Sequence, residues 1–269
     1  MRLTFRNHYF INLIINIMTG RIVFVYLLFS IFSFSGMNAQ SFKAEQQKAP
    51  RVKAAYAEKW EGLKAEMKKK NMDPNGFELF IRVFKHEKLV EVWLKPQNEK
   101  EYRLFKTYPI CYYSGDLGPK RKQGDGQVPE GFYSIAVFNP YSSYHLSLGV
   151  SYPNASDKII GKSNLGGDIM IHGNCLSIGC IPITDVFIKE LYVLAVEAKN
   201  AGQAGIPVHI FPIRMDAAGM AYLNSTYESN AALQAFWKNI QTGYAHFEEK
   251  KKLPKVSVDK AGAYVFSEK

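Results

Sequence analysis

The chain has 269 residues, 47% of them hydrophobic and 22% charged, which is typical of a folded globular protein and not of a disordered or collagen-like chain. Its 34 Lys and Arg residues outnumber its 24 Asp and Glu residues, which favours an acidic partner surface. Nucleic acid is not supported as that partner, because the sequence contains no nucleic-acid-binding module and no Gly-x4-Gly-Lys phosphate loop.

Residues 1 to 39 are predicted to be a signal peptide. They contain Arg2, Arg6 and Arg21, no acidic residue, and an apolar run over residues 22 to 34 that is followed by the small residue Ala39. The run is short for a membrane-spanning helix. We therefore expect export to the periplasm and cleavage after Ala39. The alternative is that the segment is not cleaved, and only in that case do we expect the protein to be attached to the membrane.

Residues 40 to 75 are predicted to be a polar linker that leads into an amphipathic helix. Ala57, Trp60, Leu63 and Met67 stand at helical spacing, and the turn-forming sequence 73 to 76, Asp-Pro-Asn-Gly, ends the pattern.

Residues 76 to 215 are predicted to form a mainly β domain with one core helix. From Phe77 the hydrophobic period changes to two. The strand candidates cover residues 77 to 83, 89 to 94, 102 to 111, 132 to 138, 144 to 152, 169 to 171 and 208 to 213. The helix covers residues 185 to 200, with Thr184 or Asp185 as its cap and Gly202 near its end.

Residues 216 to 269 are predicted to be a helical C-terminal extension. A helix over residues 231 to 247 carries Leu233, Phe236, Trp237 and Ile240 on one stripe, and a basic stretch follows at residues 250 to 255. The stripe predicts that this helix packs back on the β domain.

The segment from Ile169 to Cys180, Ile-Met-Ile-His-Gly-Asn-Cys-Leu-Ser-Ile-Gly-Cys, places a histidine and a cysteine together at the end of a strand. The sequence after His172 can turn tightly enough to present Cys180 as a thiol nucleophile. We expect backbone amides at Gly179 and Cys180 to face an oxyanion. The helix that follows Cys180 is expected to lower the pKa of the thiol.

The other cysteines are predicted to be structural. Cys175 is expected to pack as a small apolar residue, and Cys111 to be buried at the end of a strand. A zinc site built from His172, Cys175 and Cys180 lacks a fourth ligand and the usual Cys-x2-Cys spacing. No metal and no cofactor are therefore predicted.

The segment around His172 and Cys180 resembles the catalytic segment of the L,D-transpeptidases of the YkuD type, and most closely their YafK-like branch, in which His-Gly is followed by Ser-x-Gly-Cys. Further likeness lies in the sequences at residues 115 to 120, 124 to 125, 128 to 133, 144 to 146, 152 to 154 and 206 to 212. The resemblance covers residues 76 to 215. One departure is Ile178, which stands where many members carry His.

The resemblance implies an L,D-transpeptidase-like β-sandwich or barrel with helical N- and C-terminal extensions. It assigns Cys180 as nucleophile, His172 as the group that manages the proton, the Gly173 carbonyl as the group that orients the ring, and Gly179 as part of the oxyanion site. The substrate-binding candidates are Asp116, Lys120, Asp125, Tyr144, His145 and Ser177. For the loop residues 116, 120 and 125 turn formation is an equal alternative, and for His145 a structural role is the alternative.

The function implied is that of an exported cysteine acyltransferase acting on peptidoglycan stem peptides through a thioester. One alternative is a hydrolytic member, an L,D-carboxypeptidase or an amidase that releases wall-linked protein. The other is a non-catalytic peptidoglycan-binding module. The expected partners are stem peptides and, as a further candidate, a wall-linked protein.

Overall fold

The computed structural model describes residues 41 to 161 and 163 to 268. The predicted signal peptide lies outside the described residues. No helix within the described ranges is both long and apolar enough to cross a membrane.

The described chain begins with two helices, α2 (Phe42–Gln46) and α3 (Pro50–Lys69). Pro50 stands in the first turn of α3, where its missing N–H leaves no hydrogen bond unmade. Leu63 and Met67 are buried as predicted, but Trp60 is only partly buried and Ala57 is exposed. The buried stripe instead continues through Val52 and Ala55. At its N-terminal end, α3 therefore buries a different face from the one predicted.

The eight-stranded sheet confirms the mainly β prediction. The strand order is β3-β2-β1-β8-β4-β5-β6-β7. The strands are β1 (Phe77–Phe84), β2 (Leu89–Pro96), β3 (Arg103–Pro109), β4 (Gly131–Asn139), β5 (Ser147–Val150), β6 (Met170–His172), β7 (Ile181–Pro182) and β8 (Pro207–Phe211). The pairs β1/β8 and β6/β7 are parallel and the other neighbours are antiparallel.

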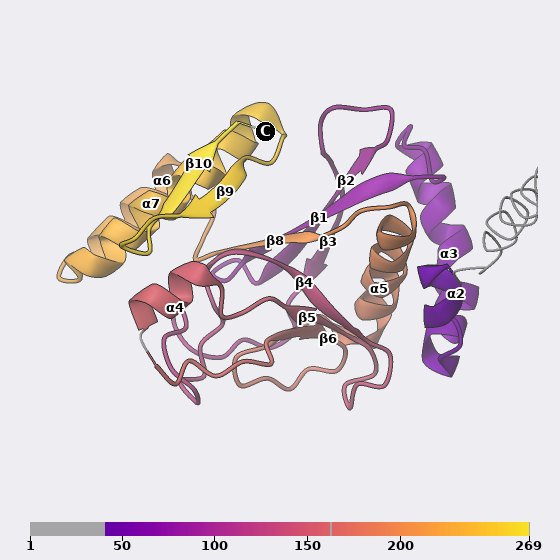
Figure 1. The fold of residues 1–269 in the computed structure, drawn as a ribbon, viewed down its shortest axis with the longest axis horizontal. Coiled ribbons are helices and arrows are strands. Elements are labelled where there is room, and N and C mark those ends of the chain that lie inside the picture. Colours follow the sequence, from indigo (N-terminus) through magenta and orange to yellow (C-terminus); the bar gives the residue numbers. More distant parts are fainter. Residues whose placement is uncertain (1–40, 162, 269) are drawn as a thin grey trace, which may run out of the picture. The chain divides into compact units, whose positions relative to one another are not determined.

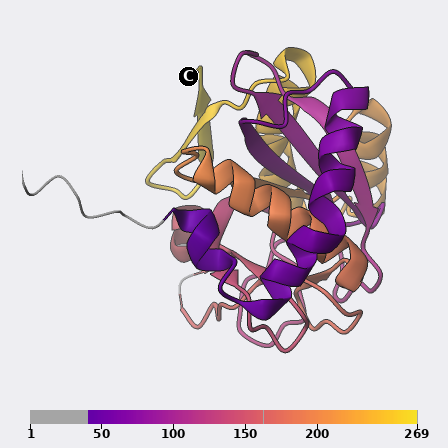
Figure 2. The same cartoon turned by 90° about the vertical axis from the view of Figure 1, so that its right-hand side faces the viewer.

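The core helix α5 (Thr184–Asn200) lies between the sheet and α3 (Figure 1). Seen from the side of α3, α5 and α3 cross each other, and α3 covers the face of α5 turned away from the sheet (Figure 2). Leu79, Ile81 and Val83 of β1 face the core shared with α5, as their period of two predicts. The alternate residues Phe80 and Phe84 face the other side.

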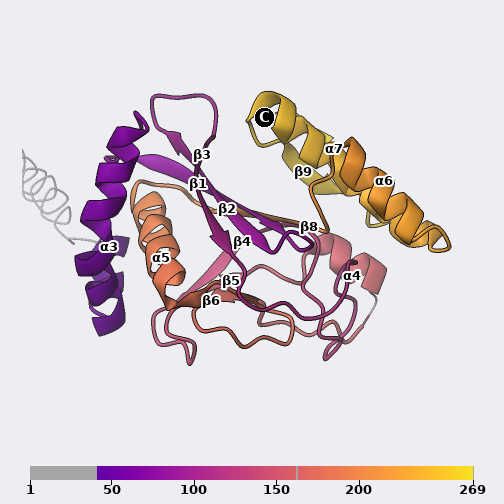
Figure 3. The ribbon, with the colours of Figure 1, turned by 180° about the vertical axis from the view of Figure 1, so that it is seen from behind.

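The C-terminal segment covers that other face of the sheet (Figures 1 and 3). It contains α6 (Ala217–Thr226), α7 (Ala231–Lys250) and a hairpin of β9 (Lys255–Val258) and β10 (Tyr264–Ser267). The prediction of the α7 helix is confirmed, whereas α6 and the hairpin were missed, as was α4 (Ala155–Gly161). Helix α7 ends within the predicted basic stretch, and its C-cap residue Lys251 has a left-handed backbone conformation. Strand β9 begins at the end of the same stretch.

The α5 cap was predicted incorrectly. The N-cap is Ile183, without a side-chain hydrogen bond, and Thr184 has a positive φ of 69°. The Asp185 carboxylate instead accepts a hydrogen bond from the Asn174 N–H, 2.8 Å away. The start of α5 is thus fastened to the loop after β6.

A fully buried ion pair joins the two halves of the sheet to α7. The Lys85 ammonium lies 2.9 Å from the Glu130 carboxylate and also donates to the Gly118 and Val128 carbonyls. Glu130 accepts from the Gly118 N–H and from the indole N–H of Trp237 in α7. Burial lowers the pKa of Lys85, and the Glu130 charge opposes that shift. All three hydrogens of the Lys85 ammonium group thus have an acceptor, and these contacts offset the free-energy cost of burying the charges.

Replacing Lys85 by Met should destabilise the protein by about 3 to 5 kcal/mol, because it leaves the Glu130 carboxylate buried without its counter-charge. The double variant Lys85→Met/Glu130→Gln should recover part of the loss. Urea denaturation measures both, and Lys95→Met is the matched control, since its partner Glu78 is partly exposed and such pairs contribute at most about 1 kcal/mol. Equal losses for Lys85→Met and Lys95→Met would contradict the assigned role.

Candidate active site

Neighbouring strands bring His172 and Cys180 to one place. The parallel β6/β7 ladder pairs Ile171 with Ile181 and His172 with Pro182, and Cys180 directly precedes β7. Because side chains alternate along a strand, Cys180 and Pro182 share a face, and this is the face of His172. The histidine and the thiol are therefore diagonal neighbours at the edge of the sheet.

Gly173 is required by packing at this edge. A side chain there would meet the Tyr144 carbonyl oxygen at 2.8 Å and would collide with the Asp185 carboxylate. The close approach lets the first turn of α5 press directly against the residue after His172. The lack of space for a side chain is therefore the reason why a glycine follows His172.

The His172 ring is fixed from two sides. Its Nδ1 lies 2.5 Å from the Gly173 carbonyl oxygen, a contact that requires a hydrogen on Nδ1 and leaves Nε2 as an acceptor. The Tyr144 ring stacks on the imidazole with centroids 4.6 Å apart. Burial lowers the pKa of His172, although the Gly173 carbonyl opposes the shift. The imidazole is therefore neutral near pH 7 and able to take a proton.

Cys180 is a partly buried free thiol, which donates a long hydrogen bond of 3.5 Å to the Asp168 carbonyl. Burial raises the pKa of the thiol, against a smaller opposite effect of the Met170 N–H. The expectation that the following helix lowers this pKa was wrong. The start of α5 faces His172 and Asn174, whose carbonyls accept from Ile183 and Thr184, and so the helix N-terminus is not directed at the sulfur.

The turn before Cys180 is held by Ser177. Its hydroxyl oxygen accepts from the N–H groups of Gly179 and Cys180, at 3.2 and 2.8 Å, and donates to the Cys180 carbonyl. Gly179 has a φ of +126° and lies against the Gln127 carbonyl, so only glycine fits. Use of these amides as oxyanion donors stays a prediction, and it requires the Ser177 hydroxyl to release them.

A disulfide joins Cys111 to Cys175. Cys175 was expected to pack as an unpaired apolar residue and Cys111 to be buried. Both predictions were wrong, since the two are bonded to each other and Cys111 is exposed. The bond ties the loop between His172 and Cys180 to the end of β3, where the Cys111 N–H also donates to the Pro182 carbonyl. The loop that leads to Cys180 is thus held at its middle as well as at both ends.

The substrate-binding candidates of the long loop after β3 differ in their surroundings. Lys120 is buried and donates to Asp125 at 2.5 Å. Burial alone would raise the pKa of Asp125, but the bond from Lys120 and three backbone N–H groups hold it below its usual value. These bonds favour the turn-forming alternative for Lys120 and Asp125. Asp116 is exposed and stays a candidate for substrate contact.

The residues after β4 border the histidine. The Tyr144 side chain is 39% exposed, so its ring can contact both His172 and a substrate. His145 has a positive φ of 71°, and burial lowers its pKa. The Arg51 guanidinium fixes its backbone by donating to the Ser142 and His145 carbonyls. These contacts fix the backbone of His145, whereas its buried Nε2 has no hydrogen-bond partner within the described residues.

Sequence reasoning missed Asp168 and Met170, which contact the sulfur, and Asp185, which fastens the loop. Asp168 and Met170 contact the sulfur through backbone atoms, and the residue type at a position does not predict such contacts. Asn174 has a left-handed φ of 59°, and Asn after Gly was the available signal for a turn there. Within the described residues, no group of three or more His, Cys, Asp and Glu side chains is arranged to hold a metal ion.

Comparison with known proteins points to one family. No family model matches the chain. It is 38% identical over 194 residues to the Escherichia coli K12 protein named "Putative L,D-transpeptidase YafK", covering 71% of this chain and 75% of that protein.

Solved structures with similarity include the helical cell shape determining protein Pgp2 of Campylobacter jejuni, 17% identical, with a TM-score of 0.41 over 69% of this chain and 74% of that one. L,D-transpeptidase 1 of Mycobacterium tuberculosis is 14% identical, with a TM-score of 0.28 over 51% of this chain and 63% of that one.

Iodoacetamide should alkylate Cys180 but neither Cys111 nor Cys175 until the disulfide is reduced. The alkylation rate should rise with a midpoint above about pH 8.5, the pKa of an ordinary thiol, because burial disfavours the thiolate. Mass spectrometry of peptides follows the three sites, with Cys180→Ser as control. Fast alkylation that persists at pH 5 would show an imidazolium-thiolate pair and contradict the neutral pair described above.

The double variant Cys111→Ser/Cys175→Ser should lose about 4 kcal/mol of stability, the free energy expected from the loop entropy when a loop of 64 residues is opened. Thermal and urea unfolding measure the loss. The single variant Cys180→Ser is the control and should unfold like the parent protein. Unchanged stability of the double variant would mean that the bond does not restrain the loop.

Proposed function

The chain belongs to the L,D-transpeptidase family, since it is 38% identical to a named member over 71% of its length, and from that premise we propose that it is an exported cysteine acyltransferase acting on peptidoglycan stem peptides. The observation that carries the proposal is the His172 ring, whose Nδ1 is bound to the Gly173 carbonyl so that Nε2 is left to accept the thiol proton. Tyr144, Asp116 and Ser177 stay candidates for substrate contact.

The proposed reaction begins with a neutral pair. As the Cys180 sulfur attacks the carbonyl carbon that follows the L-centre of a diamino acid in the stem, its proton passes to Nε2 of His172. A rotation about the Cys180 side chain must turn the sulfur from the Asp168 carbonyl toward the ring. When the tetrahedral intermediate collapses, the C–N bond breaks and His172 gives the proton to the leaving amine, which is D-alanine or another attached group. A thioester on Cys180 remains.

The second half of the reaction depends on the group that attacks the thioester. An amine gives a cross-link or an attached protein, and water gives an L,D-carboxypeptidase or an amidase that releases wall-linked protein. In both cases His172 accepts the proton of the attacking group and returns it to the departing sulfur. The hydrolytic outcome is favoured by Ile178, which is 90% exposed at the turn before Cys180 and offers an incoming amine no polar contact.

The location follows from the substrate. Peptidoglycan lies outside the inner membrane, and the basic chain suits a wall whose stem peptides carry carboxylates. We therefore place the protein in the periplasm after removal of residues 1 to 39. The disulfide agrees with an oxidising compartment.

Incubation with defined muropeptides, with and without an amine acceptor, should give an acyl-enzyme mass that is abolished in Cys180→Ala. His172→Ala should lower the rate by about 10²- to 10⁴-fold, the usual contribution of a positioned acid or base. Mass spectrometry separates cross-linked dimers from shortened stems. His145→Ala is the matched control and should retain most activity.

Turnover that survives Cys180→Ala would overturn the mechanism. Binding of muropeptides with no acyl-enzyme in the unaltered protein would instead support the non-catalytic wall-binding alternative.

A further inference from the structure

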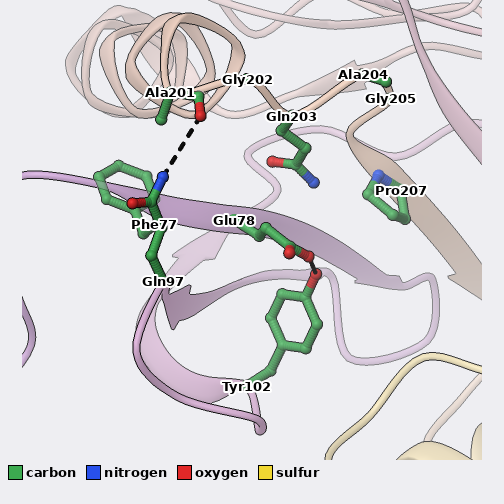
Figure 4. A pocket seen from close by; sticks show the side chains of 10 residues that line it. All are labelled: Phe77, Glu78, Gln97, Tyr102, Ala201, Gly202, Gln203, Ala204, Gly205 and Pro207. Carbon is green, nitrogen blue, oxygen red and sulfur yellow. Dashed lines mark hydrogen bonds between the residues drawn. The ribbon is translucent and has the colours of Figure 1, made fainter.

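Two adjoining cavities lie far from Cys180. One, of about 400 Å³, lies between the start of β1 and the residues that follow α5 and is bordered by Glu78, Tyr102 and Gln203 (Figure 4). The second, of about 410 Å³, is bordered by α3 and includes Trp60, Asn75 and Asn200. Phe77, Gln97 and Ala201 line both cavities, and the two neighbouring cavities together are called the groove.

The groove and the thiol lie at opposite ends of α5. The groove reaches the residues after the helix C-terminus, whereas Asp185 in its first turn contacts the residues after His172. A helix of 17 residues is about 25 Å long. The groove is therefore a site separate from the candidate active site.

The charged groups that line the groove are neutralised by partners. The Lys43 ammonium lies 2.7 Å from Glu197 and that of Lys64 lies 2.7 Å from Glu61. Glu78 pairs with Lys95 and accepts from the Tyr102 hydroxyl. Such pairing disfavours a small ion as the ligand, because an ion would have to displace an existing partner.

Side-chain amides supply the remaining hydrogen-bonding capacity. Gln97 packs against Gly76 and spends one amide hydrogen on a weak 3.4 Å bond to the Ala201 carbonyl, which leaves its other hydrogen and its oxygen available (Figure 4). The exposed Asn75 side chain adds a donor and an acceptor, and Asn200 adds donors, since its side-chain oxygen already accepts from the Lys43 N–H. The partly buried Trp60 adds an amphipathic ring, which the ammonium groups of Lys43 and Lys64 approach to 5.7 Å. Amides beside an aromatic ring, in a groove without net unpaired charge, match a neutral ligand with many hydroxyl and acetamido groups.

We propose that this groove binds an N-acetylated amino-sugar oligosaccharide, the chemistry of a wall glycan strand. The proposed function enters only in the choice of this ligand. A glycan held at one end of α5 raises the effective concentration of the attached stem peptides near Cys180 at the other end.

The test is an NMR titration of ¹⁵N-labelled Cys180→Ala protein, purified as the cell processes it, with the tetramer of N-acetylglucosamine. Signals of the Trp60 indole and of the Asn75 and Gln97 side-chain amides should shift at concentrations up to about 10 mM, in the range of weak binding. Gln97→Ala and Asn75→Ala should each weaken binding by about 2- to 12-fold, the loss expected for one neutral hydrogen bond.

Asn224→Ala removes an exposed amide of α6 outside the groove and should leave binding unchanged. The Asn75 side chain is exposed, so its variant tests the groove even if Gln97→Ala folds poorly. No shift at these residues, shifts unaffected by both variants, or the same shifts with inorganic phosphate would overturn the proposal. Since Cys180→Ala has no nucleophile, the result is independent of the acyl-enzyme experiment, and either proposal can fail alone.

Discussion

The buried pair of Lys85 and Glu130 is the constraint on which the arrangement of this protein depends. Lys85 follows β1 and Glu130 precedes β4, so the pair fixes two strands separated by β8 and the loop between them. Through Trp237 the same carboxylate holds α7 on the second face of the sheet. A buried charge is costly when alone, and this cost favours the one packing in which every donor and acceptor is paired. Three residues before Glu130, the Gln127 carbonyl lies against Gly179, which directly precedes Cys180.

The contacts around the candidate site hold it firmly, and the proposed reaction would require the Ser177 hydroxyl and the Cys180 side chain to move. The Ser177 hydroxyl occupies the amides beside Cys180, and the thiol donates to a carbonyl instead of the imidazole. Burial favours the neutral form of both His172 and Cys180. A neutral thiol resists oxidation better than a thiolate, which agrees with a protein whose other two cysteines are already oxidised to a disulfide.

The sequence predicted what depends on periodicity. The alternation from Phe77 to Val83 placed β1 and its core-facing side, and the stripe around Trp237 placed α7. Prediction from the sequence failed where a contact joins residues that are far apart in the chain. Cys111 and Cys175 are 64 residues apart, and no local pattern joins them. Asp185 looked like a helix cap, but its carboxylate had a better partner in the Asn174 N–H, which only the folded chain supplies. For Cys180, the sequence did not reveal that burial raises the pKa of the thiol, because burial depends on the folded chain.

The placement of α5 connects these observations. Its first turn presses on Gly173, where a side chain would not fit, and the chain beyond its last turn borders the groove at Gln97 and Ala201. With eight buried residues and α3 packed on its outer face, α5 is a rigid spacer and not a surface helix. A polymeric substrate contacting both ends would meet fixed positions, so it would bind without an ordering cost in the protein. In the proposed arrangement, the distance along α5 would determine which stem peptide reaches Cys180.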